Sequence, residues 1–309
     1  MNWDGIAYHS LNYHLRKKFN EKVFKISLDG GFTCPNRDGS ISDNGCIFCS
    51  GRGSGDFIPA ADLSLFEQFM KGKELLEKKW PAGKYIAYFQ AFTNTYAPVD
   101  ILRKKYEEAL SFPGVVGLAI ATRPDCLGHD VLDLLDEINK KTYLWVELGL
   151  QTIHEKTASL IHRGYSLSCF NEAVYNLNER KIESVVHLIL GLPGENKEDM
   201  LSSVKYISMQ PVQGVKLHLL HILKNTPLYQ MYLKNPFKVL EKDEYIDLII
   251  DCLELLPPDM VIHRLTGDGS KDLLIAPLWS KNKKAVLNGI HKRLKERNTW
   301  QGKFYRNHI

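Results

Sequence analysis

Hydrophobic residues follow a repeating pattern between residues 23 and 220. Short segments such as VFKISL alternate apolar and polar residues, as a half-buried strand does, and longer helical segments separate them. The pattern predicts strands at residues 23–28, 85–90, 114–122, 144–150, 185–190 and 215–220. It predicts helices between them at residues 62–79, 100–110, 130–139, 154–161, 167–180 and 197–209.

Strands that alternate with helices predict a parallel sheet with right-handed crossovers. The segment GVVGLAIAT shows no alternation, so we expect a strand that is buried on both faces. Polar and glycine-containing segments recur directly after the strands, at the edge where parallel α/β folds bind ligands. The pattern alone leaves open whether the sheet closes into a barrel.

Two flanking regions lack this alternation of strands and helices, so we assign the α/β region to residues 23–225. Residues 1–22 predict a short helical arm that docks through one apolar face and exposes its basic residues. The apolar face consists of Tyr8, Leu11, Leu15 and Phe19. We expect residues 226–309 to form a C-terminal extension packed on the α/β region, with helices at 244–256 and 282–297 and a candidate strand in VIHRLTGDG.

Three of the six cysteines lie in one loop after the first predicted strand: Cys34, Cys46 and Cys49. The loop, FTCPNRDGSISDNGCIFCSGRGSGDF, is rich in Gly, Asn, Asp and Ser and has no helical or strand period. Its Cys-x-x-Cys pair directs two sulfurs to one metal centre. A structural zinc site takes four ligands, whereas a [4Fe–4S] cluster held by three thiolates keeps one iron free for another ligand.

Two other interpretations of the loop stay open at this point. A distant histidine would complete a zinc knuckle, and a disulfide is less expected because an intracellular chain keeps its thiols reduced. The remaining cysteines, Cys126, Cys169 and Cys252, have no ligand spacing. We interpret them as small core residues and expect no second cluster.

The segments GGFTCPNRDG and GCIFCSGRGSGDF resemble the cluster loop of radical S-adenosylmethionine (SAM) proteins of the YtqA/YhcC type, over nearly the whole chain. Over the barrel, these are similar to the radical domain of the Elongator catalytic subunit and to oxygen-independent coproporphyrinogen oxidase. The resemblance implies an α/β fold with a partial (βα)6 barrel. It also implies a [4Fe–4S] cluster on Cys34, Cys46 and Cys49, SAM at the open iron, a 5′-deoxyadenosyl radical, and an electron donor such as flavodoxin or ferredoxin.

The resemblance also indicates residues that bind SAM. In FQAFTNTYAP, Gln90, Thr93 and Asn94 stand where related enzymes bind the methionine amino group. The usual Gly-Gly-Glu is missing there, and a hydrogen-bonded turn is the alternative. In HLILGLPGE, Ile189 and Gly191 match the adenine-binding edge.

The segments VELGLQT and IHRGY match a second part of that site. Gln151 corresponds to the residue that binds the ribose, and Arg163 to the one that pairs with the methionine carboxylate, for which the guanidinium fork is suited. The alternative for Arg163 is a surface position at a helix end. Glu147 is expected to point into the barrel at the cofactor, and its carboxylate needs a partner, either Arg163 or a ribose hydroxyl.

Four further polar residues near strand ends have less defined roles. We interpret His187, on an apolar strand, as a core residue. His218 and His221 lie three positions apart, so we expect a strand to point them in opposite directions, with at most one inside the barrel. Arg123, in ATRPDCL, either holds substrate or belongs to a capping loop.

Composition sets limits on the location of the protein. The 309 residues, 44% of them hydrophobic, are ordinary for a soluble globular protein. No apolar run reaches the roughly 18 residues of a membrane span, and the N-terminus lacks a signal-peptide core. We therefore expect a cytoplasmic monomer without a membrane partner.

Positive charge is concentrated near the C-terminus, although the net charge is only +4. Residues 281–306 contain nine Lys or Arg and one acidic residue. Such charge attracts phosphates, and nearby aromatic residues can stack unpaired bases. We expect a nucleic-acid contact through Lys292, Arg293, Lys295 and Arg297, with a solvated helix face as the alternative.

The resemblance implies a tRNA substrate, bound through its anticodon loop. The implied reaction converts the carboxymethylaminomethyl group at C5 of the wobble uridine to aminomethyl. Two alternatives remain: a radical SAM enzyme that acts on a small metabolite or porphyrin, and a non-enzymatic zinc-binding protein that interacts with RNA.

Overall fold

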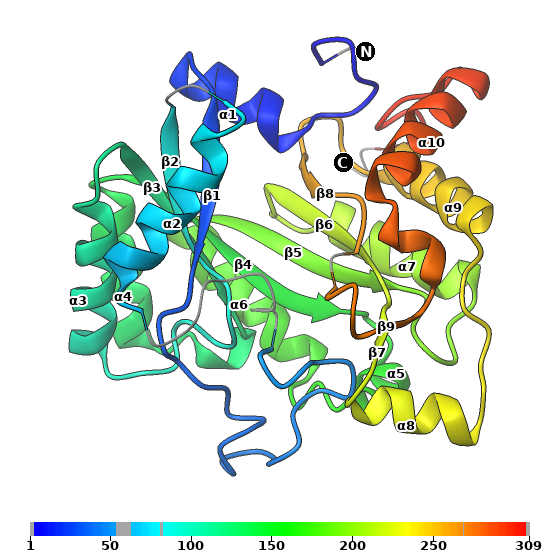
Figure 1. The fold of residues 1–309 in the computed structure, drawn as a ribbon, viewed down its shortest axis with the longest axis horizontal. Helices are drawn as coiled ribbons and strands as arrows, with labels where there is room; N and C mark the ends of the chain where they lie inside the picture. The colour runs from blue at the N-terminus through cyan, green and yellow to red at the C-terminus, as the bar shows by residue number, and fades with distance from the viewer. Residues whose placement is uncertain (1–2, 54–62, 81–82, 268, 307–309) are drawn as a thin grey trace.

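The computed structural model of the chain describes residues 3–53, 63–80, 83–267 and 269–306, and within these ranges seven parallel strands form one curled sheet (Figure 1). Six strands follow the chain order across the sheet: β1 (Val23–Leu28), β2 (Lys84–Phe89), β3 (Val115–Thr122), β4 (Tyr143–Gln151), β5 (Glu183–Leu190) and β6 (Gly214–Leu219). The expected partial barrel is confirmed. A seventh strand, β8 (Val261–Arg264), pairs in parallel with β6.

The connections between the six strands are helical, as the pattern predicts. They contain α2 (Leu65–Glu77), α3 (Val99–Leu110), α4 (His129–Asn139), α5 (Glu155–Leu160), α6 (Leu167–Glu179) and α7 (Lys197–Ser208), with a short 3-10 turn, η1 (Pro124–Cys126), after β3. The expected start of the first of these helices at residue 62 lies outside the described residues. Its N-cap is Ser64, whose side chain accepts a hydrogen bond from Glu67 N at 3.2 Å.

Alternation along the strands sorts side chains to two faces of the sheet. The outward side chains join the helices in the largest hydrophobic cluster; on the strands they include Ile26, Ala87, Leu118, Val146, Val186 and Leu217. The inward side chains near the strand starts form a second cluster, which includes Val23, Ile86, Trp145 and Val185. Beyond that cluster the inward positions are occupied by polar side chains, as expected for a binding site inside the curled sheet.

The N-terminal arm docks as predicted. Helix α1 (Leu11–Phe19) places Leu15, which is 2% exposed, in the inner cluster with Trp145 and Val185, while Lys17 and Lys18 are exposed. The helix starts at Ser10, whose hydroxyl accepts from Tyr13 N. The arm therefore closes the inner face of the sheet at the end away from the strand tips.

The C-terminal segment packs on the sheet and contributes a strand to it. It contains α8 (Pro227–Lys234), α9 (Lys242–Leu255), α10 (Lys283–Glu296) and the 3-10 turn η2 (Leu278–Lys281), and β7 (Ile222–Leu223) pairs antiparallel with β9 (Leu274–Ala276). The buried Gln301 donates to the carbonyls of Pro257 and Met260 and accepts from His9 N, so it ties the end of the chain to the N-terminal arm. Across the described residues, every helix is too short or too polar to cross a bilayer.

Candidate active site

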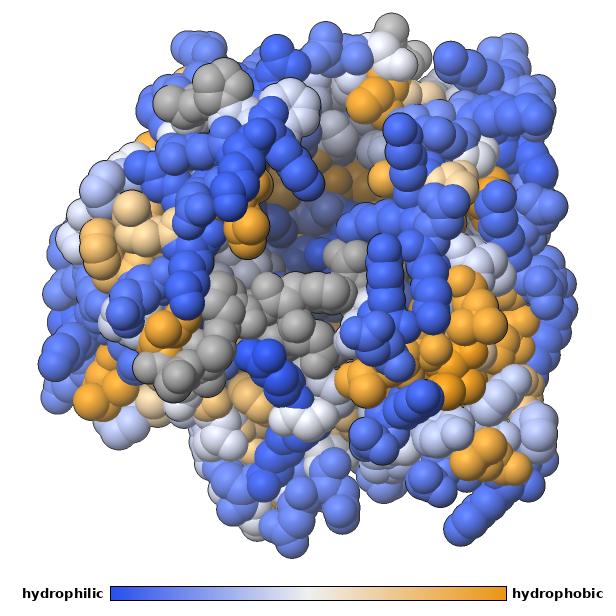
Figure 2. Space-filling model, in the orientation of Figure 1, coloured by the Kyte–Doolittle hydropathy of each residue, from blue (hydrophilic) through white to orange (hydrophobic). Residues whose placement is uncertain are grey.

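A cavity of about 660 Å³ lies inside the curled sheet. Figure 2 shows the surface hollowed near the centre of the face in view. The cavity volume falls in the range of small-molecule sites. The cluster loop and the strand ends line it together. Residues selected from the sequence that line it are Cys34, Cys46, Cys49, Gln90, Thr93, Glu147, Gln151, Arg163 and Ile189.

One side chain links the cysteine loop to the rest of the barrel, and a second links residues within the loop. Asn36 donates to the carbonyl of His162 at 2.7 Å and to Cys46 Sγ at 3.5 Å. Arg37 donates to the carbonyls of Ser50 at 2.7 Å and Cys49 at 3.4 Å. The loop is therefore held in place by protein contacts, and its sulfurs face the cavity.

The two thiols of the Cys-x-x-Cys pair are shifted in opposite directions, since a hydrogen bond with Cys46, together with burial, raises the pKa of Cys49 well above its usual value. A hydrogen bond from Cys49, followed by one from Asn36 and the charges of Arg123 and Arg37, lowers the pKa of Cys46 to about 7, although burial opposes the shift. No three His, Cys, Asp or Glu side chains of the described chain are arranged around a single ion. Cys34, Cys46 and Cys49 all line the one cavity, and three thiolates suit an iron–sulfur cluster with one open iron.

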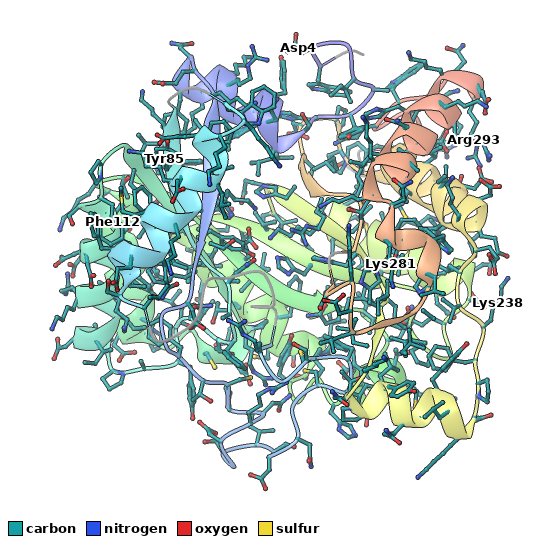
Figure 3. All side chains as sticks on the ribbon, in the orientation of Figure 1. Asp4, Tyr85, Phe112, Lys238, Lys281 and Arg293 are labelled. Carbon is teal, nitrogen blue, oxygen red and sulfur yellow. The ribbon has the colours of Figure 1, made fainter. Side chains whose placement is uncertain are left out.

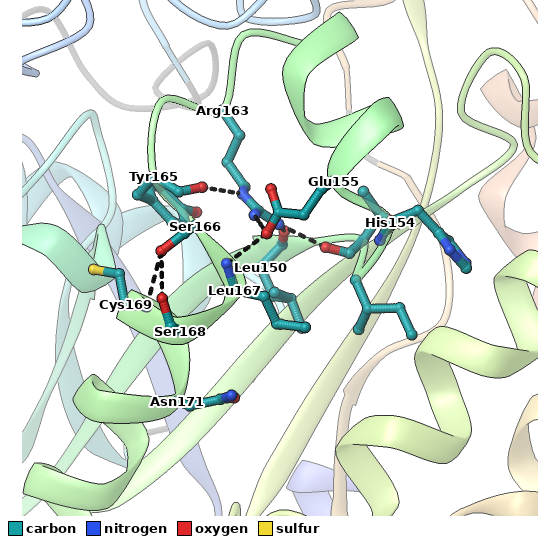
Figure 4. A network of polar contacts seen from close by, with 12 residues as sticks. Leu150, His154, Glu155, Arg163, Tyr165, Ser166, Leu167, Ser168, Cys169 and Asn171 are labelled. Atoms are coloured by element: carbon teal, nitrogen blue, oxygen red, sulfur yellow. Dashed lines mark hydrogen bonds and ion pairs between the residues drawn. The ribbon is translucent and has the colours of Figure 1, made fainter.

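Arg163 is buried, so the surface alternative for it is wrong (Figure 4). It is 1% exposed, and its guanidinium donates to the carbonyl of Thr152 at 2.7 Å and to that of Tyr165 at 2.9 Å, and pairs with Glu155 at 3.1 Å. These contacts join the end of β4 to the segment between α5 and α6. Arg163 thus braces the cavity wall in addition to lining it, and its contact with a cofactor carboxylate stays a prediction.

Gln151 lies at an irregular point of the sheet. The pairing of β4 with β5 shifts between Gly149 and Gln151, and Gln151 has a φ of +68°, in the left-handed region that residues other than glycine rarely adopt. Such strain is found most often where function fixes the backbone. Here the side chain borders the cavity, which agrees with its predicted contact to a ribose.

Two predicted cofactor residues do not line the cavity. Asn94 is fully buried and its amide donates to the carbonyl of Ala121 at 2.8 Å, as the turn alternative predicts. Gly191 has a φ of +89°, and a Cβ added there would lie 3.2 Å from the Leu240 side chain. Both positions shape the loops around Thr93 and Ile189, which do line the cavity.

Glu147 lies in a buried polar cluster. The sequence interpretation had placed this residue at the cofactor. Its carboxylate accepts from Tyr88 Oη at 2.6 Å, from His187 Nε2 at 2.9 Å and from Trp145 Nε1 at 3.0 Å, and pairs with Lys216. The expectation that Arg163 pairs with the Glu147 carboxylate is wrong. Burial alone would raise the pKa of Glu147, but Lys216 and Lys25 hold that pKa well below its usual value, so the group is a carboxylate.

Lys25 and Lys216 are functional candidates that the sequence interpretation missed. Lys25 Nζ lies 3.8 Å from Glu147, and Lys216 Nζ lies 2.9 Å from Tyr88 Oη. Each lysine stands at an inward position in the middle of its strand, VFKISL or GVKLHL. A charge in the middle of a buried strand was the available signal, because such a charge needs a partner across the fold.

The histidine predictions need correction. His218 and His221 both line the cavity, because β6 ends at Leu219 and His221 lies beyond the strand, where the alternation of directions no longer applies. His187 is also not the core residue that was expected, because it lines the cavity and is hydrogen-bonded to Glu147. Burial, with the charge of Lys216, lowers the pKa of His187 to about 4, so its ring is neutral near pH 7.

Arg123 acts as a brace at the cavity rim. It pairs with Asp125 at 2.7 Å and donates to the carbonyl of Arg163 at 3.0 Å. Among the other cysteines, Cys252 is a core residue as predicted, whereas Cys126 and Cys169 are only half-buried, so their interpretation as core residues is wrong.

The basic C-terminal helix is less available for phosphates than its sequence suggests. Arg297 pairs with Asp247 and Asp251 of α9, both at 2.6 Å, and Arg293 also binds Asp247; Figure 3 shows Arg293 on α10. These two arginines join α10 to α9, which corrects the expectation that they face a nucleic acid. Lys292 and Lys295 are exposed, and Lys292 makes an i,i+4 pair with Glu296 at 3.6 Å.

Comparisons with known proteins cover nearly the whole chain. Residues 38–207 match the Radical SAM superfamily and residues 212–296 the Radical_SAM C-terminal domain. The chain is 52% identical to YtqA of Bacillus subtilis over 298 residues, which is 96% of this chain and 92% of YtqA. It is 37% identical to YhcC of Escherichia coli over 270 residues, 87% and 86% of the two chains.

One solved structure shows the same fold with low sequence identity. Elp3 of the archaeon Methanocaldococcus infernus, determined with an N-terminal deletion, has a TM-score of 0.68 at 19% identity. The match covers 90% of this chain and 64% of that one. The likeness extends beyond β6 into the C-terminal segment.

Proposed function

The chain belongs to the radical SAM superfamily, and on this premise we propose that it modifies the C5 side chain of the wobble uridine of tRNA, from carboxymethylaminomethyl to aminomethyl. Members of this family use a [4Fe–4S] cluster and SAM. The observation that carries the proposal is one cavity that joins the three-cysteine loop to a cationic interior. That combination suits radical chemistry on an anionic substrate.

The chain's own residues would divide the work between cofactor and substrate. Cys34, Cys46 and Cys49 would hold the cluster, while Gln90, Thr93, Gln151 and Ile189 border the space in which SAM would bind. When bound, the cofactors supply a carbon-centred radical that can remove a hydrogen atom. The buried cavity walls exclude water from this step, and a one-electron donor such as flavodoxin or ferredoxin would reduce the cluster.

The substrate assignment is supported by the site and by the surface. An anticodon base can turn out of its loop without breaking a duplex, which keeps the cost of reaching an internal cavity low. Exposed lysines on α10, including Lys292 and Lys295, would then contact phosphates. The methylene between the amine and the carboxylate of the uridine side chain is the proposed site of hydrogen removal. Loss of a second electron to a one-electron acceptor would give an imine, and water would hydrolyse this imine to the aminomethyl group and glyoxylate.

The test is nucleoside mass spectrometry of tRNA from a strain that lacks this gene, in a host that makes the modification. We expect carboxymethylaminomethyluridine to accumulate and the aminomethyl-derived forms to disappear. Restoring the wild-type gene should reverse both changes, and a Cys46→Ala gene should reverse neither. An unaltered tRNA profile would reject the tRNA substrate and favour a small-molecule radical enzyme.

A further inference from the structure

Two lysines from strands at opposite sides of the sheet meet inside the barrel. Lys25 lies on β1 and Lys216 on β6, and each ammonium lies 4.6 Å from the centroid of the Tyr88 ring. Curling of the sheet brings them together, since four strands separate β1 from β6. Both line the same cavity as the cluster cysteines.

The negative charge beside these lysines is smaller than their positive charge. Among the described residues that line the cavity, Glu147 is the one acidic side chain. Its oxygens already accept from Tyr88, Trp145 and His187, and Lys216 is its close ion-pair partner. Lys25 approaches it only to 3.8 Å, which is too long for a hydrogen bond. Two lysine side chains therefore share one carboxylate that has little remaining capacity, and burial lowers the pKa of both lysines.

A buried cation without a full counter-charge is costly. Burial, with the nearby charge of Arg264 and despite Glu147, lowers the pKa of Lys25. An anion placed beside Lys25 would relieve this cost. The interior is thus built to gain from binding a negatively charged group.

A third group points to a ligand at the same place. Nε2 of His218 is buried and has no hydrogen-bond partner among the described residues, and the His218 ring lies 5.1 Å from that of His187. Buried polar atoms are nearly always satisfied, so an unsatisfied one that lines a cavity indicates a missing ligand or water. His218 and Lys25 both border this interior space.

We propose that Lys25 and Lys216 bind the carboxylate of the substrate side chain, and so select the carboxymethylaminomethyl uridine over its product. This inference rests on the proposed function. Lys25 and Lys216 stand inside their strands, whereas Gln90 and Gln151 stand at strand ends beside the cysteine loop. The lysines therefore serve the substrate, and the strand ends serve SAM.

The test measures binding of a short anticodon stem–loop RNA to the cluster-loaded protein with SAM and without reductant. The RNA is prepared with uridine, carboxymethylaminomethyluridine or aminomethyluridine at the wobble position. The wild type should bind the carboxylate form about ten- to a hundredfold more tightly than the uridine form, the range for one charge-assisted hydrogen bond. Lys25→Met should reduce this ratio to about one while the dissociation constant of the uridine form, SAM affinity and iron content stay unchanged.

Controls separate charge at this site from folding and from total charge. Lys216→Met should act like Lys25→Met, and Lys104→Met, which removes an exposed charge on α3, should keep the wild-type ratio. A folding defect would weaken all three RNA forms together and leave the ratio intact. The proposal is overturned if the wild-type ratio is near one, or if it survives in both Lys25→Met and Lys216→Met. Equal weakening of all three forms by a Lys25→Met protein with wild-type circular dichroism and iron content would indicate a backbone phosphate instead, and would also overturn the proposal.

Failure of the proposed function gives a different result. If none of the RNA forms binds, the tRNA assignment fails. Binding of the free nucleosides then tests whether the two lysines form a carboxylate site. A preference for the carboxylate-bearing nucleoside that disappears in Lys25→Met would still support the site. Equal binding of both nucleosides, or no binding, would reject it.

Discussion

The side-chain amide of Asn36 lies 3.5 Å from Cys46 Sγ and also donates to the carbonyl of His162 at 2.7 Å. Asn36 is 1% exposed, so these hydrogen bonds are shielded from water. One side chain thus fixes Cys46 against the segment that carries Arg163. The position of the cysteine loop depends on this link.

We predict that Asn36→Ala loosens the loop. The part-buried carbonyl of His162 loses its donor, which should lower the free energy of unfolding by about 0.5–1.5 kcal/mol. Urea denaturation measures this, and iron content after reconstitution should fall as well. Asn44→Ala, at an exposed position of the same loop, is the control and should change neither. Normal stability and iron content in Asn36→Ala would contradict the prediction.

The three loop cysteines should be individually essential. Cys34→Ala, Cys46→Ala and Cys49→Ala should each abolish the cluster absorbance and the formation of 5′-deoxyadenosine, because three thiolates are needed to leave one iron open. Cys126→Ala and Cys169→Ala, at half-buried positions outside the loop, should retain both. A dispensable loop cysteine would show that the cluster assignment is wrong.

Arg163 should matter for stability as well as for SAM. Arg163→Ala leaves the buried carbonyl of Thr152 and the part-buried carbonyl of Tyr165 without this donor, so we expect a loss of about 2 kcal/mol in the free energy of unfolding. Arg163→Lys keeps the charge but not the planar fork, and should recover only part of this loss. Where the variants fold, SAM affinity measured by titration calorimetry should fall about ten- to a hundredfold in Arg163→Ala. Unchanged stability and affinity would remove Arg163 from both roles.

His187 should make the fold sensitive to mild acid. Its pKa is lowered to about 4 in the folded protein, whereas an unfolded histidine titrates near 6.5. Between these values the unfolded chain binds the extra proton, so stability should fall as pH decreases from about 6.5 to 4, by up to about 1.4 kcal/mol per pH unit. Urea denaturation of His187→Gln across this range should show a slope smaller by that amount. Identical slopes for both proteins would contradict the prediction.

The exposed lysines of α10 should account for the salt dependence of tRNA binding. Replacing Lys292 and Lys295 together by Gln should reduce the log–log slope of affinity against salt by about 0.7–0.9 for each phosphate that is no longer neutralised. Arg297→Gln should instead lower stability, because it breaks pairs with Asp247 and Asp251. A steep slope that survives the double lysine change would place the phosphate-binding residues elsewhere.

Local patterns in the sequence predicted much of the fold. The alternation in VFKISL and the uniform apolarity of GVVGLAIAT identified strands, and the cysteine spacing identified the loop that faces the cavity. These features depend on residues close in the chain, where periodicity is informative. The candidate site came instead from the family resemblance, which indicated Gln151 and Arg163, and both line the cavity.

Long-range pairing was the part that the sequence did not predict. Glu147 finds Lys216, 69 residues away, only because the sheet curls, and no local pattern encodes that curl. Arg297 pairs with Asp251, 46 residues away, so its charge suggests an RNA contact until the packing of α10 on α9 is known. The expectation that at most one of His218 and His221 lies inside the barrel was wrong, because β6 ends at Leu219 and strand ends are set by tertiary contacts.

The most direct test of the account is a single-turnover reaction with the reduced, cluster-loaded protein, SAM and tRNA from the gene-deletion strain. The account predicts that 5′-deoxyadenosine forms in step with loss of carboxymethylaminomethyluridine and gain of aminomethyluridine. Deuterium placed on the methylene next to the carboxylate should appear in the 5′-deoxyadenosine. Formation of 5′-deoxyadenosine with unchanged tRNA and no deuterium transfer would contradict the proposed substrate.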